Sequence, residues 1–289
     1  MWFHYDKLYA DLVAPDGTLC VAYVARLRLA GLTLDSAGVE LYTTDGARTV
    51  QRARSAPSVE SCLGDGALHV ALELEDGRFE LQQAVRAGRW RPSSPHPSPH
   101  LQWTVEVARA AARAEWSGNG TPHTLIGTGY ADRVTLTRPP RALGISRLRW
   151  GRVHLPHATI VFNALEPVRG ASWRRALYWP DTDGPREWCD VDVAGDDLRT
   201  RVTWPAGTSL EPLDLRRERV LHEGAALDGA RFPSRAERWL TQILSGPLRE
   251  TRQLSRVEGA APAWALHETV AFGATAAAPL RLAPPVFVE

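Results

Sequence analysis

Asp-Gly dipeptides recur along the 289-residue chain and constrain its fold more than any other sequence feature. They begin at Asp16, Asp45, Asp65, Asp76, Asp183 and Asp228, mostly between runs in which apolar and polar residues alternate. Glycine accepts the positive φ of a tight hairpin turn, so Asp-Gly between alternating runs predicts two antiparallel strands joined by a hairpin. The sequence therefore predicts an all-β, antiparallel protein.

The alternating runs have the length and spacing of a meander. One apolar face runs from Leu19 to Leu29, and a second from Leu68 to Leu74, before Asp76-Gly77. Many evenly spaced antiparallel strands predict a sheet that closes into a barrel or sandwich. The segment 107–115 stays open between helix and strand, because its alanines suit a helix. The best helical pattern, 234–245, predicts one short helix in the C-terminal half.

Two proline-rich breaks divide the chain. The segment 91–100 predicts a Pro/Ser loop, and the segment 138–141 precedes a new alternating series that begins at Leu148. We therefore place a domain boundary near residue 143, between units 1–143 and 144–289. Two β units of similar size suggest a duplicated barrel, although no clear internal repeat is visible.

Composition excludes several classes of function. Lys and Arg number 34 and Asp and Glu 33, so no nucleic-acid or anionic-membrane partner is expected. No stretch reaches the roughly 20 apolar residues of a membrane span, so stable membrane insertion is not expected. The N-terminus lacks the layout of a signal peptide, and the three cysteines show no metal-ligand spacing; both favour a reduced, cytoplasmic location. Without a Gly-rich phosphate loop, no nucleotide or redox cofactor is expected.

The segment 127–133, followed by 149–152, is the strongest candidate for chemistry. Read as a strand, it places Tyr130 and Asp132 on one, more apolar face and Arg133 on the other. Desolvation raises the pKa of a carboxyl group and keeps it protonated, as a general acid in an apolar pocket requires. The alternative is a structural Asp132 paired with an arginine, which would lower that pKa. Tyr130 could orient Asp132, face a developing cation, or simply fill the core.

Further residues could line a binding pocket. Trp150, Arg152 and His154 share a face if 148–155 is a strand, although Arg152 could instead be a structural brace stacked on tryptophan. Asn163, in an apolar run, could bind a ligand oxygen or serve the fold. The chain has 11 tryptophans, Trp103 among them, and these could form an aromatic cavity for a polyunsaturated ligand or fill the core.

Two weaker candidates complete the set. Arg133 would contact the ligand only if a β-bulge turned it towards Asp132. His154 and His157 lack a third ligand, so no metal is expected.

Gly129-Tyr-Ala-Asp132, followed by Trp150-Gly-Arg152, resembles the signature of the carotenoid 1,2-hydratase (hydroxyneurosporene synthase) family. Trp103-Thr-Val105, and weaker similarities near both ends of the chain, occur in the same order. The chain departs from the family pattern where Arg133 replaces a histidine, where Val134-Thr-Leu136 replaces Asn-Trp-Gly, and where Lys7-Leu8 replaces an aromatic pair.

The resemblance implies two lipocalin-like barrels packed side by side, with a site near their junction. It also implies substrates that are long, apolar polyenes or isoprenoids. The departures from the family pattern favour a divergent activity over simple carotenoid hydration.

Three functions remain open from the sequence. The first is a cofactor-independent cyclase or hydratase in which Asp132 protonates a C=C bond, the altered Arg133 region favouring cyclisation. The second is a pericyclase that accelerates a reaction by folding a polyene. The third is a lipocalin-like carrier of an apolar metabolite without turnover, since fold alone does not establish function.

Overall fold

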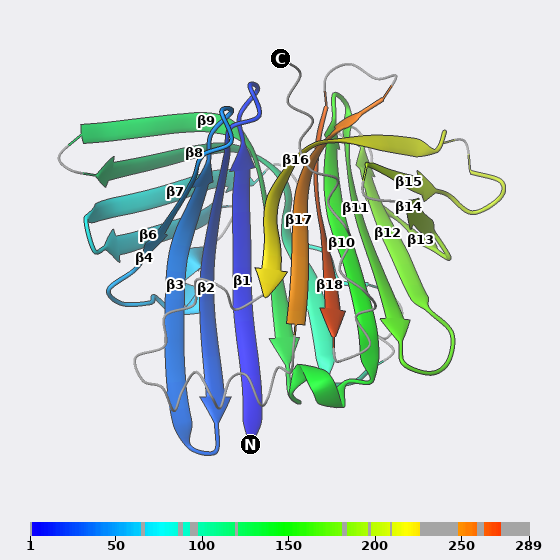
Figure 1. Cartoon of the computed structure of the whole chain (residues 1–289), viewed down its shortest axis with the longest axis horizontal. Helices are drawn as coiled ribbons and strands as arrows, with labels where there is room; N and C mark the ends of the chain where they lie inside the picture. Colours follow the sequence, from blue (N-terminus) through cyan, green and yellow to red (C-terminus); the bar gives the residue numbers. More distant parts are fainter. Residues whose placement is uncertain are drawn as a thin grey trace, which may run out of the picture.

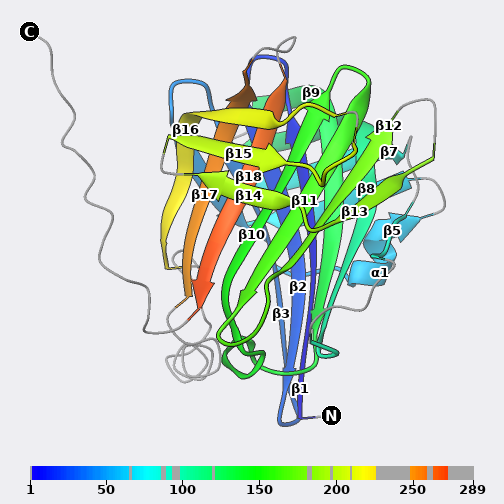
Figure 2. The same cartoon turned by 90° about the vertical axis from the view of Figure 1, so that its right-hand side faces the viewer.

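The computed structural model describes residues 2–64, 67–85, 89–92, 98–118, 121–180, 184–195, 198–208, 210–225, 248–258 and 263–272. Within these residues the protein is almost entirely β, with two antiparallel sheets of nine strands each. Figures 1 and 2 show the two sheets standing side by side as two lipocalin-like barrels. The all-β prediction is confirmed, and so is the packing of two barrels.

The first sheet has the strand order β4-β3-β2-β1-β9-β8-β7-β6-β5. Its strands are β1 (Phe3–Val13), β2 (Leu19–Leu29), β3 (Leu32–Tyr42), β4 (Arg48–Arg52), β5 (Leu63–Gly64), β6 (Ala67–Leu74), β7 (Gly77–Val85), β8 (Leu101–Gly118) and β9 (Thr121–Leu136). A single helical turn, α1 (Val59–Cys62), precedes β5. An isolated bridge between Ala53 and Leu74 joins the two ends of this curled sheet.

The second sheet repeats the same topology, in the order β13-β12-β11-β10-β18-β17-β16-β15-β14. Its strands are β10 (Ile145–Leu155), β11 (Ala158–Pro167), β12 (Trp173–Pro180), β13 (Arg186–Cys189), β14 (Asp192–Gly195), β15 (Arg199–Thr203), β16 (Leu213–Ala225), β17 (Leu248–Val257) and β18 (Trp264–Phe272). In each sheet the first strand pairs with the last. The 3-10 helix Pro140–Ala142 lies between the sheets along the chain. The boundary at residue 143 stays a prediction.

The turn chemistry agrees with the sequence where it can be followed. Asp16-Gly17, Asp45-Gly46 and Asp76-Gly77 join adjacent strands, with φ of 88° at both Gly17 and Gly46. Asp183, Asp228 and the pair at 65–66 lie outside the described residues, as does the helix predicted at 234–245. The ambiguous segment 107–115 is part of strand β8, because it pairs with β7 on one side and β9 on the other.

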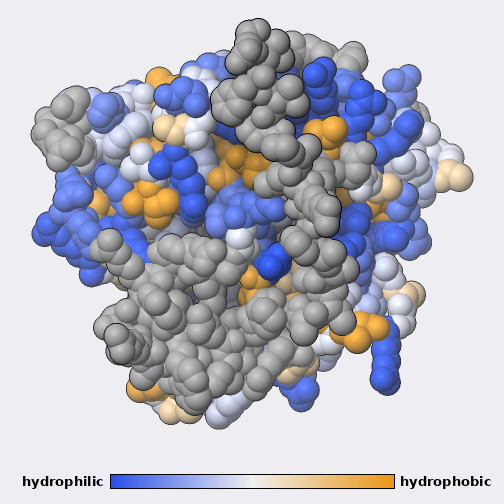
Figure 3. Space-filling view, in the orientation of Figure 1, coloured by the Kyte–Doolittle hydropathy of each residue, from blue (hydrophilic) through white to orange (hydrophobic). Residues whose placement is uncertain are grey.

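Apolar side chains form a core inside each barrel and a third core between them. The first barrel is filled by residues such as Leu12, Leu72 and Phe79, and the second by residues such as Ile160 and Phe162. The core between the barrels combines aromatic residues of the first sheet with side chains of the second. On the face drawn in Figure 3, the described surface is mostly hydrophilic, with small separate hydrophobic patches. A fourth apolar cluster, which includes Phe3, Ile145 and Trp173, also combines residues of both sheets.

A buried ion pair connects the two sheets through the core between the barrels. Arg152 on β10 donates from Nε to Asp11 Oδ2 on β1 at 3.0 Å, and its Nη2 donates to Oδ1. Both side chains are fully buried. Burial raises the pKa of Asp11, and the Arg152 guanidinium opposes that shift. This bidentate geometry fixes the position of β10 relative to β1.

Replacing only one member of this pair should destabilise the protein strongly. Arg152→Ala leaves the Asp11 carboxylate buried without a partner, and we expect a loss of about 3 to 5 kcal/mol in the free energy of unfolding. The double variant Asp11→Leu/Arg152→Met should lose less than Arg152→Ala, because no buried charge remains unpaired. Urea denaturation of both variants measures this. A loss below about 1 kcal/mol for Arg152→Ala would contradict the assigned role.

Candidate functional site

Strand β9 presents Tyr130 and Asp132 to the core between the barrels. In the ladder, Tyr9 pairs with Asp132 and Asp11 pairs with Tyr130, so all four side chains share the face that packs on the second sheet. Gly129 lies on the reverse face, where a Cβ atom would be 2.7 Å from Gln83 Nε2. The Gly-Tyr-x-Asp pattern therefore puts a glycine where the backbone packs closely inside the first barrel. It directs the Tyr130 and Asp132 side chains out of that barrel, towards the second sheet.

Two hydrogen bonds hold the Asp132 carboxyl group. Tyr130 Oη donates to Asp132 Oδ2 at 2.9 Å, and Trp103 Nε1 of β8 donates to the same oxygen at 3.1 Å. Asp132 is 5% exposed, and Tyr130 is fully buried. Among the described residues, none donates a hydrogen bond to Oδ1. A proton on this carboxyl group would therefore reside on Oδ1, which is free to present it.

Burial raises the pKa of Asp132 to about 7. The hydrogen bonds from Trp103 and Tyr130 favour the carboxylate and oppose this shift, but desolvation outweighs them. No arginine in the described part of the chain forms an ion pair with Asp132; Arg133 pairs with Asp6, and Arg152 with Asp11. The alternative of an arginine-paired structural carboxylate therefore does not describe the environment of Asp132.

The second motif, Trp150-Gly151-Arg152, faces the first across the core between the barrels. Trp150 Nε1 donates to Tyr130 Oη at 3.4 Å, and the two rings lie 5.5 Å apart between centroids. The Arg152 guanidinium lies 6.0 Å from the centre of the Tyr130 ring. A Cβ atom at Gly151 would be 2.3 Å from Phe162 Cζ, so close packing inside the second barrel requires glycine there. The two motifs thus form one site built from both sheets.

The shared face predicted for Trp150, Arg152 and His154 is present on β10. His154 is buried, and its Nδ1 is 3.0 Å from Thr159 Oγ1. Burial lowers the pKa of His154 well below its usual value, and the charge of Arg152 adds to the effect, so the imidazole is neutral at pH 7. Asn163 lies opposite Trp150 on β11 and is 4% exposed, so it belongs to the same face.

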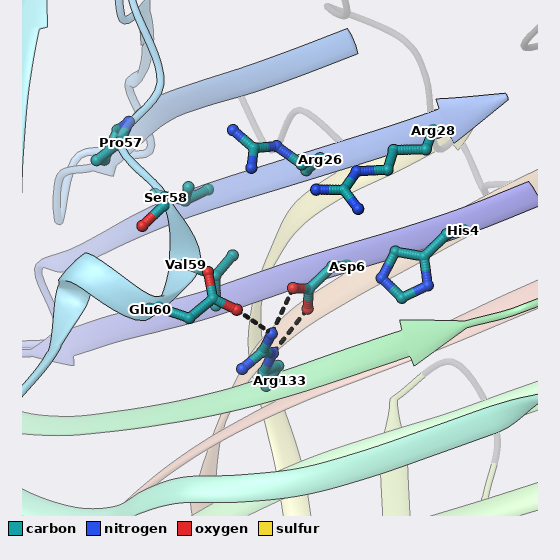
Figure 4. A pocket seen from close by; sticks show the side chains of 10 residues that line it. His4, Asp6, Arg26, Arg28, Pro57, Ser58, Val59, Glu60 and Arg133 are labelled. Atoms are coloured by element: carbon teal, nitrogen blue, oxygen red, sulfur yellow. Dashed lines mark hydrogen bonds and ion pairs between the residues drawn. The ribbon is translucent and has the colours of Figure 1, made fainter. Parts of the chain in front are cut away.

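Arg133 lies on the opposite face of β9, as the alternation predicts. Its guanidinium donates to Asp6 at 2.7 and 2.5 Å and to Glu60 of α1 at 2.7 Å. These residues line a polar cavity of about 150 Å³ together with His4 and two arginines of β2 (Figure 4). No register shift interrupts the pairing of β1 with β9 at this position. Because Arg133 points away from Asp132, we correct its assignment as a residue that binds substrate beside Asp132.

Sequence reasoning missed several residues of this face. The sequence does not identify Asp11 as the partner of Arg152, and Trp103, for which it predicts a place in a ligand cavity or in the core, hydrogen-bonds Asp132. Also missed was Arg252 of β17, which is 5% exposed and forms ion pairs with three carboxylates, those of Glu40, Glu250 and Glu268. The alternation of polar Lys7, Tyr9 and Asp11 in β1 was the available signal.

The described residues contain no group of three or more His, Cys, Asp or Glu side chains that could hold a metal ion. None of their helices is both long and apolar enough to cross a membrane.

Comparison with known proteins gives a fold but no close relative. No family profile and no curated protein matches the chain. A solved structure provisionally named AttH, from Nitrosomonas europaea, aligns with a TM-score of 0.62 at 11% identity, over 93% of this chain and 92% of that one. CghA aligns with a TM-score of 0.60 at 13% identity, over 93% and 88% of the two chains. Kievitone hydratase from Nectria haematococca aligns with a TM-score of 0.57 at 11% identity, over 93% and 88%.

At these identities the matches show the fold alone, and that fold agrees with the one that the resemblance implies.

The raised pKa of Asp132 predicts a distinctive dependence of stability on pH. The folded protein holds a proton on Asp132 up to about pH 7, whereas an unfolded aspartate loses it near pH 4, so the stability of the wild type falls as pH rises between these values. In the Asp132→Asn variant the neutral amide resembles the protonated carboxyl group, so the stability of the variant should not fall in this way as pH rises. We expect the variant to exceed the wild type in unfolding free energy by up to about 4 kcal/mol above pH 7.

Urea denaturation at several pH values between 4 and 8.5 measures the difference. The difference in unfolding free energy between Asp132→Asn and the wild type should shrink towards zero near pH 4. Asp35→Asn, which changes an exposed aspartate paired with Arg26, is the matched control and should show no such trend. An Asp132→Asn variant that is less stable than the wild type at pH 8 would show that the carboxylate form stabilises the fold.

Proposed function

We propose that this protein is a cofactor-independent enzyme that protonates a C=C bond of an apolar polyene or isoprenoid, leading to cyclisation or hydration. Asp132 is the general acid. The observation that carries the proposal is its carboxyl group, buried between two barrels, without an arginine partner in the described chain and with a pKa of about 7. The fold shared with a protein named as a hydratase supports the same class of reaction.

The surroundings of Asp132 suit the donation of a proton to carbon. The proton on Oδ1 forms a new C–H bond while the π bond breaks and leaves a carbocation. The negative charge left on the carboxylate is stabilised by the hydrogen bonds from Tyr130 and Trp103, which are in place before the reaction. Burial keeps competing water away from the acid.

Tyr130 is proposed as a positioning residue. Its hydroxyl orients the carboxyl group, and its ring already lies beside the positive charge of Arg152, so it is poorly placed to stabilise a second cation. The ring of Trp150, 7% exposed and between Tyr9 and Tyr130, is the better candidate for contact with a carbocation.

The cation has two possible fates. In hydration, water forms a C–O bond and loses a proton to the Asp132 carboxylate, so that the acid is regenerated. In cyclisation, a second C=C bond of the substrate forms a C–C bond, and a neighbouring carbon then loses its proton to the carboxylate.

Incubation in D₂O with linear polyenes and isoprenoids tests the acid directly. The exchanged carboxyl group of Asp132 should place deuterium on carbon in the wild-type product, and a mass gain of D₂O distinguishes hydration from cyclisation. Asp132→Asn cannot donate the proton and should lower turnover by at least 100-fold. Product mass spectrometry measures both results, and Asp35→Asn should retain full activity.

Other outcomes point to the alternatives. An isomerised product without deuterium, formed equally by wild type and Asp132→Asn, would indicate a pericyclase. Recovery of unchanged, bound ligand would indicate a carrier.

The pH dependence of turnover gives a second test. Turnover requires the protonated acid, so kcat should fall as pH rises through about 7. Tyr130→Phe removes a hydrogen bond that favours the carboxylate, so the pKa of Asp132 should rise and this decline should move to higher pH. The maximum kcat should also fall, because the acid becomes weaker. Tyr178→Phe, in the second barrel, is the control. A Tyr130→Phe profile that keeps its midpoint would contradict the assigned role.

A further inference from the structure

Three buried polar atoms on strands β10 and β11 have no hydrogen-bond partner among the described residues. They are Arg152 Nη1, His154 Nε2 and Asn163 Oδ1. The residues that carry them are 0%, 8% and 4% exposed. An unsatisfied buried polar group costs about 1 to 3 kcal/mol, and native proteins contain few of them. Three of these atoms on one face therefore require an explanation.

All three lie on the face that packs against the first sheet. Arg152 and His154 alternate with Trp150 along β10, and Asn163 pairs with Trp150 across the ladder with β11. Trp150 in turn contacts Tyr9 and Tyr130 of the first sheet. The unpartnered atoms thus border the same aromatic cluster that holds Asp132.

The chemistry of these atoms selects a neutral oxygen. Asp11 already binds Nε and Nη2 of Arg152, so the charge of the guanidinium is compensated while Nη1 remains a free donor. Asn163 Oδ1 is an acceptor, so the ligand must also offer it a hydrogen-bond donor. A carboxylate would add an uncompensated buried charge and has no donor to offer, whereas a neutral hydroxyl group can accept from Nη1 and donate to Oδ1.

We infer that the substrate carries a neutral hydroxyl group, whose oxygen accepts from Arg152 Nη1 and whose O–H donates to Asn163 Oδ1, while the unsaturated carbons lie over Trp150. This inference rests on the proposed function, because it names the class of substrate for the same site. The substrate is then an oxygenated polyene or isoprenoid, and a pure hydrocarbon leaves these buried groups unpaired. A site built to hydrogen-bond a substrate oxygen discriminates against the analogue that lacks it.

Three acyclic isoprenoid probes test the inference: the alcohol geraniol, the hydrocarbon myrcene and the acid geranic acid. Binding is followed by quenching of tryptophan fluorescence. The wild type should bind the alcohol at least fivefold more tightly than the hydrocarbon, and the acid no more tightly than the alcohol. Asn163→Leu should weaken alcohol binding about fivefold to tenfold and leave hydrocarbon binding unchanged or improved. Gln102→Leu, at an exposed position of β8, is the matched control and should behave as the wild type.

The stability of the ligand-free variant is a second readout. Replacing an unpaired buried amide with an apolar side chain of similar size should leave the midpoint of urea denaturation unchanged or raise it. A clearly lower midpoint would show that Asn163 serves the fold, and would overturn the inference. Equal binding of alcohol and hydrocarbon, or binding of neither, would also overturn it.

The same probes separate this inference from the proposed function. A preference for the alcohol that depends on Asn163, with no deuterium on carbon after incubation in D₂O, supports the inference and contradicts acid catalysis. Deuterium incorporation that depends on Asp132, with equal binding of alcohol and hydrocarbon, does the reverse.

Discussion

The ion pair between Asp11 and Arg152 holds together the arrangement on which the rest of the site depends. It connects the first strand of one sheet to the first strand of the other, and both partners are fully buried. Because it fixes β10 against β1, Trp150 reaches the Tyr130 hydroxyl and the Arg152 guanidinium covers the Tyr130 ring. A buried ion pair contributes little net stability, since desolvation offsets most of the attraction between the charges. We interpret its value here as geometric.

Packing the two sheets together also sets the protonation state of Asp132. Desolvation favours the neutral carboxyl group, while the Tyr130 and Trp103 hydrogen bonds favour the carboxylate. The balance leaves a pKa near neutrality, where the acid is protonated and still able to donate. Burial without the two hydrogen-bond donors would make Asp132 a weaker acid. The donors without burial would leave Asp132 as a carboxylate at pH 7.

The sequence predicted those features that depend on local periodicity. Alternation placed Tyr130 with Asp132, put Arg133 on the opposite face, and grouped Trp150, Arg152 and His154. It could not assign Asp11 to Arg152, which is 141 positions away, or Trp103 to Asp132, because contacts between strands depend on how the sheets pack. The alanines of segment 107–115 favour a helix by propensity, but pairing on both sides makes it a strand. The sequence also could not explain the glycines of the two motifs. The reason for each lies in the side chain that a Cβ atom would contact, Gln83 at Gly129 and Phe162 at Gly151.

The central claim is that Asp132 is protonated near neutral pH inside the folded protein. Difference infrared spectroscopy of wild type against Asp132→Asn, titrated from pH 4 to 9, isolates the C=O stretch of this one carboxyl group. We expect a protonated carboxyl band that persists above pH 6 and disappears with a midpoint near 7. A band that disappears near pH 4 would show an ordinary carboxylate and would contradict the assignment of Asp132 as the acid.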